Sequence, residues 1–236
     1  MKNKKIIAFV FARGGSKGLP GKNILPLGNI PLLAHSIKLA KQLDQVDDIY
    51  VSTDDNAIKK VALEYGAKVI ERPAELAQDD SKELDAWRHA IESLESSAVD
   101  FEVMLSLPAT SPMRAKEDVE GCIDLLDEET DAVITVTPAN RNPYFNMVRR
   151  NENGASTIFA PSSGYSNRQE APAVYDMTTV AYVVHKDFVR RAERILDGRV
   201  KSLVIPKLRA VDIDDELDYE FAKLLWRQAN SASSKE

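Results

Sequence analysis

A loop rich in glycine and basic residues follows the first apolar run of the chain, and its composition is typical of a phosphate-binding loop. Residues 8–23 read AFVFARGGSKGLPGKN. Glycines let successive backbone N–H groups approach phosphate oxygens closely, and basic side chains neutralise the charge of a triphosphate. The glycines are Gly14, Gly15 and Gly18, and the cations are Arg13, Lys17 and Lys22. We predict a polyphosphate site here, with a flexible basic surface loop as the alternative.

The spacing of these glycines excludes two common nucleotide-binding motifs. It matches neither the dinucleotide pattern G-x-G-x-x-G nor the P-loop pattern G-x-x-x-x-G-K-[ST]. The predicted site therefore belongs to another class of phosphate-binding protein.

Two aspartates near the C-terminus are candidate metal ligands. Asp212 and Asp214 alternate along a segment expected to be extended, so both carboxylates point to one side. Two carboxylates facing a triphosphate suit Mg²⁺, which keeps several waters and takes few protein ligands. The alternative is that Asp214 or Asp215 caps the helix expected next.

Histidine and cysteine do not indicate a second site. His35, His89 and His185 show no metal-ligand spacing, and we assign none of them to chemistry. The single cysteine, Cys122, excludes an internal disulfide framework. It falls on the apolar side of an expected helix, which indicates a buried and inert thiol.

Apolar runs and amphipathic segments alternate along the chain, which predicts an α/β fold: a mostly parallel sheet flanked by helices. Strands are expected at 6–11, 48–53, 68–71, 101–107, 132–137, 178–184 and 202–205, and helices at 31–43, 57–65, 81–94, 116–126, 188–196 and 215–228. The glycine loop then emerges at the carboxyl end of the first strand, where open α/β sheets bind ligands.

The alternation is interrupted at residues 139–177, which contain several prolines and no strong helix pattern. We interpret this segment as an inserted arm of hairpins and loops that reaches another subunit; a long surface loop is the alternative. The 236 residues otherwise suit a single large domain, 1–236.

Composition limits the partners of the protein. A formal net charge of −6 argues against non-specific binding of nucleic acid. The N-terminal MKNKK leads directly into a strand, so no signal peptide is expected. No apolar run approaches the roughly 20 residues of a membrane span. We therefore expect a cytoplasmic protein without membrane contact.

Several motifs in order resemble those of the CMP-sialic acid synthetases (acylneuraminate cytidylyltransferases), which are related to the Kdo cytidylyltransferases. The motifs are ARGGSKGLPGKN (12–23), YVSTDD (50–55), ERPAELAQDD (71–80), ATSPMR (109–114), NRQ (167–169) and VDIDDELD (211–218). The resemblance covers the chain to about residue 228. It implies a Rossmann-like fold of the nucleotide-diphospho-sugar transferase type, CTP as substrate and Mg²⁺ as cofactor.

The resemblance also implies roles for single residues. Arg13 and Lys22 are the expected catalytic residues, with Lys22 nearest the reacting phosphorus. Arg72 matches a nucleotide-contacting arginine, although it could instead pair with a carboxylate at the strand end. Ser111 and Arg114 are expected to face the nucleotide or to organise its loop. The complete nucleotide-binding set is Ala12, Arg13, Gly14, Gly15, Ser16, Lys17, Lys22, Asn23, Arg72 and Ser111, and the metal pair is Asp212 and Asp214.

The acceptor side of the site is implied in the same way. Arg168 and Gln169 match residues placed near the incoming sugar, and Tyr182 matches an aromatic residue of the same pocket. An arginine is suited to gripping a carboxylate bidentately. The resemblance further implies a homodimer formed through the arm, with Arg168 reaching into the partner's active site.

The implied reaction is the attack of the anomeric hydroxyl of a nonulosonic or related 2-keto-3-deoxy sugar acid on the α-phosphate of CTP, which releases pyrophosphate. The chain departs from the family in two places: DMTTV (176–180) replaces RPNGA, and Pro108–Ala109 replaces Gln-Pro. The first change predicts a sugar other than N-acetylneuraminate, and the second affects contacts to the base. A nucleotidyltransferase for another NTP or a sugar 1-phosphate, and a non-catalytic nucleotide sensor, are the alternatives.

Overall fold

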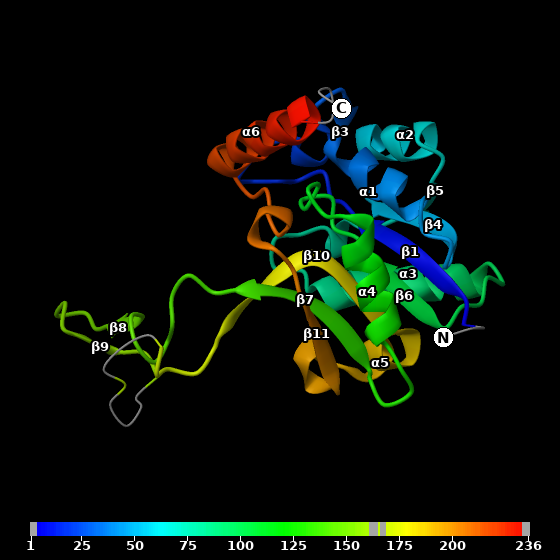
Figure 1. Ribbon diagram of the computed structural model, residues 1–236. Helices are drawn as coiled ribbons and strands as arrows, with labels where there is room; N and C mark the ends of the chain where they lie inside the picture. The colour runs from blue at the N-terminus through cyan, green and yellow to red at the C-terminus, as the bar shows by residue number, and fades with distance from the viewer. Residues whose placement is uncertain (1–3, 161–164, 166–168, 233–236) are drawn as a thin grey trace.

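A seven-stranded sheet forms the centre of the protein, in the order β11-β7-β10-β6-β1-β4-β5 (Figure 1). The computed structural model describes residues 4–160, 165 and 169–232. The strands of this sheet are β1 (Ile6–Phe11), β4 (Val46–Thr53), β5 (Lys68–Glu71), β6 (Val103–Ser106), β7 (Ala132–Pro138), β10 (Tyr175–His185) and β11 (Val200–Val204). All pairings are parallel except those of β10, which runs antiparallel to β6 and β7. The predicted fold class, a mostly parallel sheet flanked by helices, is confirmed.

Helices cover both faces of the sheet because side chains alternate between the two faces along each strand. On β1, Ala8 and Val10 pack in one apolar cluster, whereas Ile7 and Phe9 pack in the other. The first cluster includes α1 (Leu32–Ala40), α2 (Asn56–Glu64) and α4 (Lys116–Leu125), and the second includes α3 (Glu83–Ser96) and α5 (Lys186–Arg191). Cys122 on α4 is fully buried, and burial raises the pKa of its thiol to about 12, as expected for an inert group.

A smaller third cluster attaches the C-terminal helix α6 (Glu216–Ala232) to the body of the protein. Tyr219 and Ala222 of α6 pack against Leu27 and Leu32, next to a hairpin that the sequence did not predict. That hairpin consists of β2 (Pro26–Leu27) and β3 (Ile30–Pro31), and short 3₁₀ helices lie at η1 (Lys22–Ile24), η2 (Ala74–Leu76), η3 (Ile195–Asp197) and η4 (Lys207–Arg209). The helix expected at 188–196 is divided between α5 and η3.

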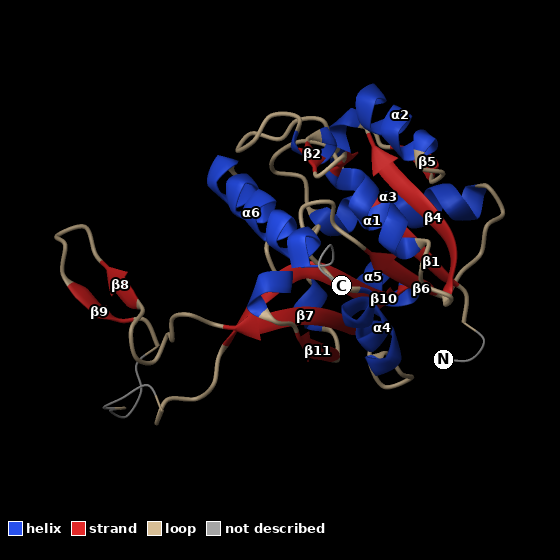
Figure 2. Cartoon of the chain, turned by 45° about the horizontal axis from the view of Figure 1, so that its top comes forward, coloured by secondary structure: helices blue, strands red, loops and turns tan. Residues whose placement is uncertain are grey.

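The predicted arm leaves the sheet after β7 and projects away from it in both views (Figures 1 and 2). It contains a hairpin of β8 (Val148–Arg150) and β9 (Ser156–Ile158). Residues 175–177, expected in the arm, instead begin β10 and pair with β7. The arm returns at the same edge of the sheet that it left, which is why β10 runs antiparallel to its neighbours.

None of the helices within residues 4–160 and 169–232 combines the length and the apolar character that a membrane span requires.

Candidate active site

The loop after β1 is fixed to the carboxyl edge of the sheet by hydrogen bonds. Ala12 N–H donates to the carbonyl of Ser52 on β4 at 3.1 Å, and Gly14 N–H donates to Asp54 Oδ1 at 3.0 Å. The side chain of Asn23 donates to the carbonyl of Arg13 at 3.0 Å. Both ends of the loop are therefore held, and its interior residues lie over the ends of β1 and β4.

Two of the loop glycines are required by close packing. A Cβ at Gly14 would lie 2.8 Å from Asp55 Oδ2, and a Cβ at Gly18 would lie 2.5 Å from the carbonyl oxygen of Asp214. Gly15, by contrast, faces open space. Because Gly18 has no side chain, the loop can pack directly against the segment that carries the predicted metal ligands.

The cations of the loop contact carboxylates in the structure. Arg13 donates to Asp79 Oδ1 at 2.8 Å and to the carbonyl of Ala77 at 3.2 Å, and Lys17 forms an ion pair with the same Asp79. The hydrogen bond from Lys17 lowers the pKa of Asp79. The sequence analysis does not predict this role for Asp79, although Asp79 lies in the same motif as Arg72, ERPAELAQDD.

Lys22 joins the loop to the predicted metal pair. Its Nζ lies 3.1 Å from Asp214 Oδ1, across 192 positions of the chain. The Lys22 side chain is only 13% exposed, whereas Asp214 projects into solvent. The structure therefore brings together the predicted catalytic lysine and a predicted metal ligand.

Arg72 is buried at the end of β5 and holds neutral oxygens rather than a carboxylate. Its guanidinium donates to the hydroxyl of Ser52 at 3.1 Å and to the carbonyl of Ser52 at 2.8 Å, above the ring of Phe11. Burial lowers its pKa to about 10, which leaves it charged at neutral pH. Within the described part of the chain, no carboxylate lies within ion-pair distance of Arg72. The alternative interpretation, an ion pair at the end of the strand, is therefore wrong.

Ser111 and Arg114 are enclosed within the protein. The hydroxyl of Ser111 lies 2.6 Å from that of Thr179 on β10, and its side chain is fully buried. Arg114 donates to Ser36 on α1 at 3.3 Å and to the carbonyl of Pro108. These contacts favour the second of the two predicted roles, the organisation of the loop after β6. Direct contact of Ser111 with a nucleotide stays a prediction.

The side chains of Asp212 and Asp214 do not cap α6. The sequence left open whether Asp214 or Asp215 caps this helix, and the structure shows that Asp215 does. Asp215 and Asp218 cap α6: Asp215 Oδ1 accepts from Asp218 N–H at 3.0 Å, and Asp218 Oδ2 accepts from the N–H groups of Asp214 and Asp215. Asp212 Oδ1 is buried and has no hydrogen-bond partner among the described residues. Burial raises the pKa of Asp212 and the charge of Asp214 adds to this shift, whereas the hydroxyls of Thr110 and Thr179 near the carboxylate oppose it.

The unpartnered oxygen of Asp212 makes the pair suitable for a cation. Over the described ranges, no three histidine, cysteine, aspartate or glutamate side chains gather as a metal-binding group. Mg²⁺ is nevertheless often held by only one or two carboxylates, with substrate phosphates and water as its remaining ligands. The donor set therefore fits the predicted Mg²⁺.

A cavity of about 590 Å³ lies beside Tyr182, between β10, α3 and η3. The ring of Tyr182 packs against the edge of Trp87, with their centroids 5.7 Å apart, and burial raises the pKa of the Tyr182 hydroxyl. The cavity is lined by Lys82, Glu83, Leu84, Trp87, Met177, Tyr182, Glu193, Arg194 and Ile195. Its apolar and charged walls can hold a hydroxylated, charged molecule.

Of the other two predicted acceptor residues, the structure describes only Gln169, which does not line the cavity beside Tyr182. Gln169 lines a separate cavity of about 320 Å³ at the base of the arm, with Arg141, Asn142 and Tyr175 among its neighbours. Arg168 lies outside the described residues. Within one chain, the structure thus separates Gln169 from the cavity that contains Tyr182.

Comparison with known proteins supports the resemblance seen in the motifs. The family model described as Cytidylyltransferase matches residues 7–224. The CMP-N,N'-diacetyllegionaminic acid synthase of Campylobacter jejuni is 33% identical over 224 residues, which cover 94% of each chain. The post-translational flagellin modification protein B of Campylobacter coli is 31% identical, with 96% of this chain and 97% of the relative covered. The N-acylneuraminate cytidylyltransferase of Escherichia coli is 30% identical over 96% of this chain and 53% of its own length.

The fold agrees with this relationship. A solved structure of CMP:2-keto-3-deoxy-manno-octonic acid synthetase complexed with CTP superposes with a TM-score of 0.71, covering 95% of this chain and 99% of the other at 19% identity. At that identity the likeness concerns the fold alone, whereas the family model spans nearly the whole sequence. The chain belongs to the cytidylyltransferase family of nucleotidyltransferases.

Proposed function

We propose that the protein transfers CMP from CTP to the anomeric hydroxyl of a nonulosonic or related 2-keto-3-deoxy sugar acid and releases pyrophosphate. The observation that carries the proposal is the pairing of Lys22 with Asp214 at 3.1 Å. This contact supports a single site, with the cations of the glycine loop on one side and the carboxylates of Asp212 and Asp214 on the other. The names of the relatives add the acceptor class, since they specify legionaminic, N-acylneuraminic and pseudaminic acids.

The residues of the site would act mainly by positioning and charge. In the proposed reaction the sugar hydroxyl forms a bond to the α-phosphorus while the bond to the pyrophosphate oxygen breaks. Arg13, Lys17 and Lys22 would hold the triphosphate and meet the charge on the departing pyrophosphate. Asp212 and Asp214 would hold Mg²⁺, which supplies further charge stabilisation when bound. Arg72, already desolvated beside Ser52, would contact the nucleotide.

We assign the 590 Å³ cavity to the sugar acid. The rings of Trp87 and Tyr182 offer an apolar wall, and the cations Lys82 and Arg194 suit its carboxylate. Met177, one of the residues that depart from the family pattern, also lines this cavity. A changed residue in the wall supports an acceptor whose substituents differ from those of N-acetylneuraminate. We place the reaction in the cytoplasm, together with its nucleotide substrate.

We expect the protein to form a homodimer through the arm. The hairpin leaves Met147, Val148, Ile158 and Phe159 exposed, between 39% and 57%, which forms an apolar surface unusual for a free loop. Light scattering at micromolar concentration should give twice the 26.2-kDa chain mass. Replacing Val148 and Phe159 with serine should yield a folded monomer of reduced activity, because Arg168 and Gln169 would then lack a partner site. A fully active monomeric wild type would contradict this expectation.

A substrate panel tests the proposed function directly. The pure protein is incubated with Mg²⁺, one of the four ribonucleoside triphosphates and one candidate acceptor, and released pyrophosphate is measured. The acceptors are N,N'-diacetyllegionaminic, pseudaminic, N-acetylneuraminic and 2-keto-3-deoxy-manno-octonic acids and a set of sugar 1-phosphates. We expect release with CTP and a nonulosonic acid, with N-acetylneuraminate a poorer acceptor.

The other outcomes of the panel are equally informative. Turnover with another triphosphate or with a sugar 1-phosphate would replace the proposal by a related nucleotidyltransferase. Binding of CTP without turnover on any acceptor would favour a nucleotide sensor. The Asp212→Asn variant is the matched control, because any release that it retains does not arise from the proposed site.

A further inference from the structure

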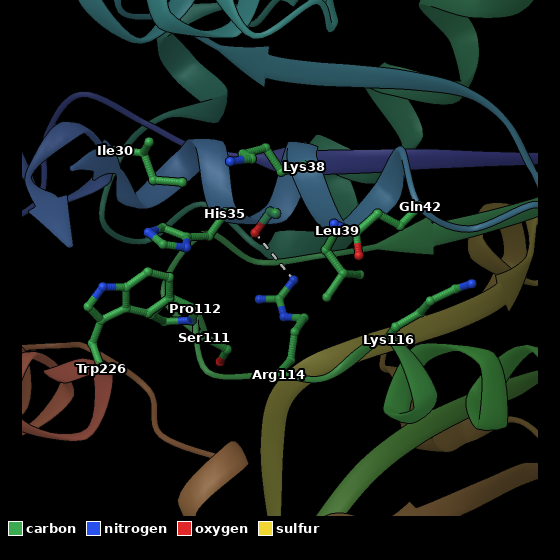
Figure 3. Close-up of a pocket in the computed structure, with 11 residues that line it drawn as sticks. Ile30, His35, Lys38, Leu39, Gln42, Ser111, Pro112, Arg114, Lys116 and Trp226 are labelled. Atoms are coloured by element: carbon green, nitrogen blue, oxygen red, sulfur yellow. Dashed lines mark hydrogen bonds between the residues drawn. The ribbon is translucent and has the colours of Figure 1, made fainter. Parts of the chain in front are cut away.

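A second cavity, of about 300 Å³, opens between α1, α6 and the first turn of α4 (Figure 3). The loop of residues 108–115 contributes Ser111, Pro112 and Arg114 to this cavity and also contacts the segment that carries Asp212. On one side of this loop the carbonyl of Thr110 accepts from Ile213 N–H at 2.8 Å, whereas on the other side Arg114 reaches Ser36 on α1. The cavity is lined by Ile30, His35, Ser36, Lys38, Leu39, Gln42, Ser111, Pro112, Arg114, Lys116 and Trp226.

The lining of this cavity is strongly cationic. It contains Lys38, Arg114 and Lys116 and no aspartate or glutamate. The ammonium group of Lys116 lies 3.2 Å from Glu120, one turn further along α4, whereas the ion pairs among the described residues do not include Lys38 or Arg114. The lining itself therefore carries a net positive charge, although the charges of Asp212 and Asp118 outside it act on Arg114.

Arg114 is the central feature of the cavity. Figure 3 shows its guanidinium in the middle of the labelled residues, between Trp226 and Lys116. The side chain is only 6% exposed, its hydrogen bonds go to neutral oxygens of Ser36 and Pro108, and its Nε has no partner among the described residues.

The acidic group of α4 in this region does not supply the missing partner. Asp118 already pairs with Arg209 at 2.9 Å. Asp118 and Asp212 act on Arg114 through space, but neither forms an ion pair with it. The guanidinium of Arg114 is therefore a buried charge without a directly bonded anion among the described residues, whereas buried charges are normally paired.

One wall of the cavity is aromatic and neutral. The rings of His35 and Trp226 meet edge to face with their centroids 4.7 Å apart. His35 Nε2 lies 3.0 Å from the carbonyl of Leu27, which assigns the ring proton to Nε2, and burial lowers the pKa of the imidazole. The positive charge of the cavity thus comes from the lysines and Arg114, and Trp226 provides a surface for the uncharged part of a ligand.

We propose that this cavity binds the phosphate group of a small-molecule ligand, at a site separate from the glycine loop. Arginine presents a planar fork that matches phosphate oxygens, and two flexible lysines can complete the neutralisation of a dianion. The volume suits a ligand no larger than a sugar phosphate. An occupant contacts the loop of residues 108–115, which also holds Ile213 next to Asp212.

Fluorescence quenching at Trp226 tests the site without knowledge of the natural ligand. The chain has two tryptophans, and Trp87 is 1% exposed, so the emission accessible to iodide belongs to Trp226. At constant ionic strength, inorganic phosphate should protect Trp226 from iodide in a saturable manner. Acetate should protect much less, because it carries one charge. The Trp226→Phe variant should lose the emission that iodide quenches, which identifies Trp226 as its source.

Variants of the exposed lysines decide whether the protection comes from this cavity. Lys38→Gln combined with Lys116→Gln should weaken phosphate protection by roughly tenfold or more, since two charge-assisted contacts are lost. Lys60→Gln, on the outer face of α2, and Lys17→Gln, in the glycine loop, should leave it unchanged, and melting temperatures confirm that each variant folds. Absence of saturable protection, equal protection in the double variant, or its loss in Lys17→Gln would each overturn the proposal.

Discussion

Replacing Lys22 with methionine is expected to lower the maximal rate of CMP transfer by roughly 10²-fold or more, with a smaller change in CTP affinity. Lys22 begins η1 directly after Gly21, whose φ of +66° lies in the left-handed region that favours glycine. Its ammonium group is largely buried and lies beside Asp214, next to the predicted metal ion. A cation in that position meets charge that develops as pyrophosphate departs, rather than charge already present in bound CTP.

Two further variants separate catalysis from binding. Lys22→Arg should restore little activity, because a planar guanidinium does not reproduce a compact ammonium group beside one oxygen. Lys17→Met is the matched control: Lys17 belongs to the same loop but its side chain is 79% exposed, so its loss should raise the Michaelis constant for CTP more than it lowers the maximal rate. Saturation kinetics in CTP measure both effects. An unchanged maximal rate in Lys22→Met would assign this lysine to binding alone.

The sequence predicted those parts of the structure that are determined by residues close together in the chain. Strand β1 is a continuous apolar run, and its two clusters follow from simple alternation of side chains. Helix α2 begins where the side chain of Asp55 accepts two backbone N–H groups and ends before Gly66, at a φ of +75°. The cations of the glycine loop were found in the same way, because residue type and spacing alone indicate phosphate binding.

The parts that could not be predicted depend on contacts between distant segments. The antiparallel direction of β10 is fixed by where the arm returns, which no residue of β10 encodes. Asp79 meets Arg13 across 66 positions, and nothing near either residue indicates the other. The sequence left open whether Asp214 or Asp215 caps α6, because both stand at suitable positions. The structure identifies Asp215, whose Oδ1 accepts from the backbone N–H of Asp218 in the first turn of the helix.

The second large effect is expected at the aspartate pair: Asp212→Asn and Asp214→Asn should each abolish most turnover without loss of the fold. Removing a ligand of Mg²⁺ removes charge stabilisation worth several kcal/mol in the transition state. Asp215→Ala is the matched control, since loss of a helix cap costs about 1 kcal/mol of stability and should leave the rate largely intact. Rate and melting temperature, measured on the same samples, distinguish the two classes of variant.

The pH dependence of stability adds a sharper test for Asp212. Its pKa is raised in the folded protein by burial, so ionisation favours the unfolded chain and the cost is fully present above the folded pKa. The neutral amide introduced by Asp212→Asn carries no such cost, and this variant should therefore melt at the same or a higher temperature than wild type at neutral pH. The difference should shrink as the pH falls through the folded pKa, where wild type becomes protonated. A variant that melts lower at neutral pH and keeps its activity would show instead that Asp212 is structural, because a metal ligand held at the expense of stability must lose function when its charge is removed.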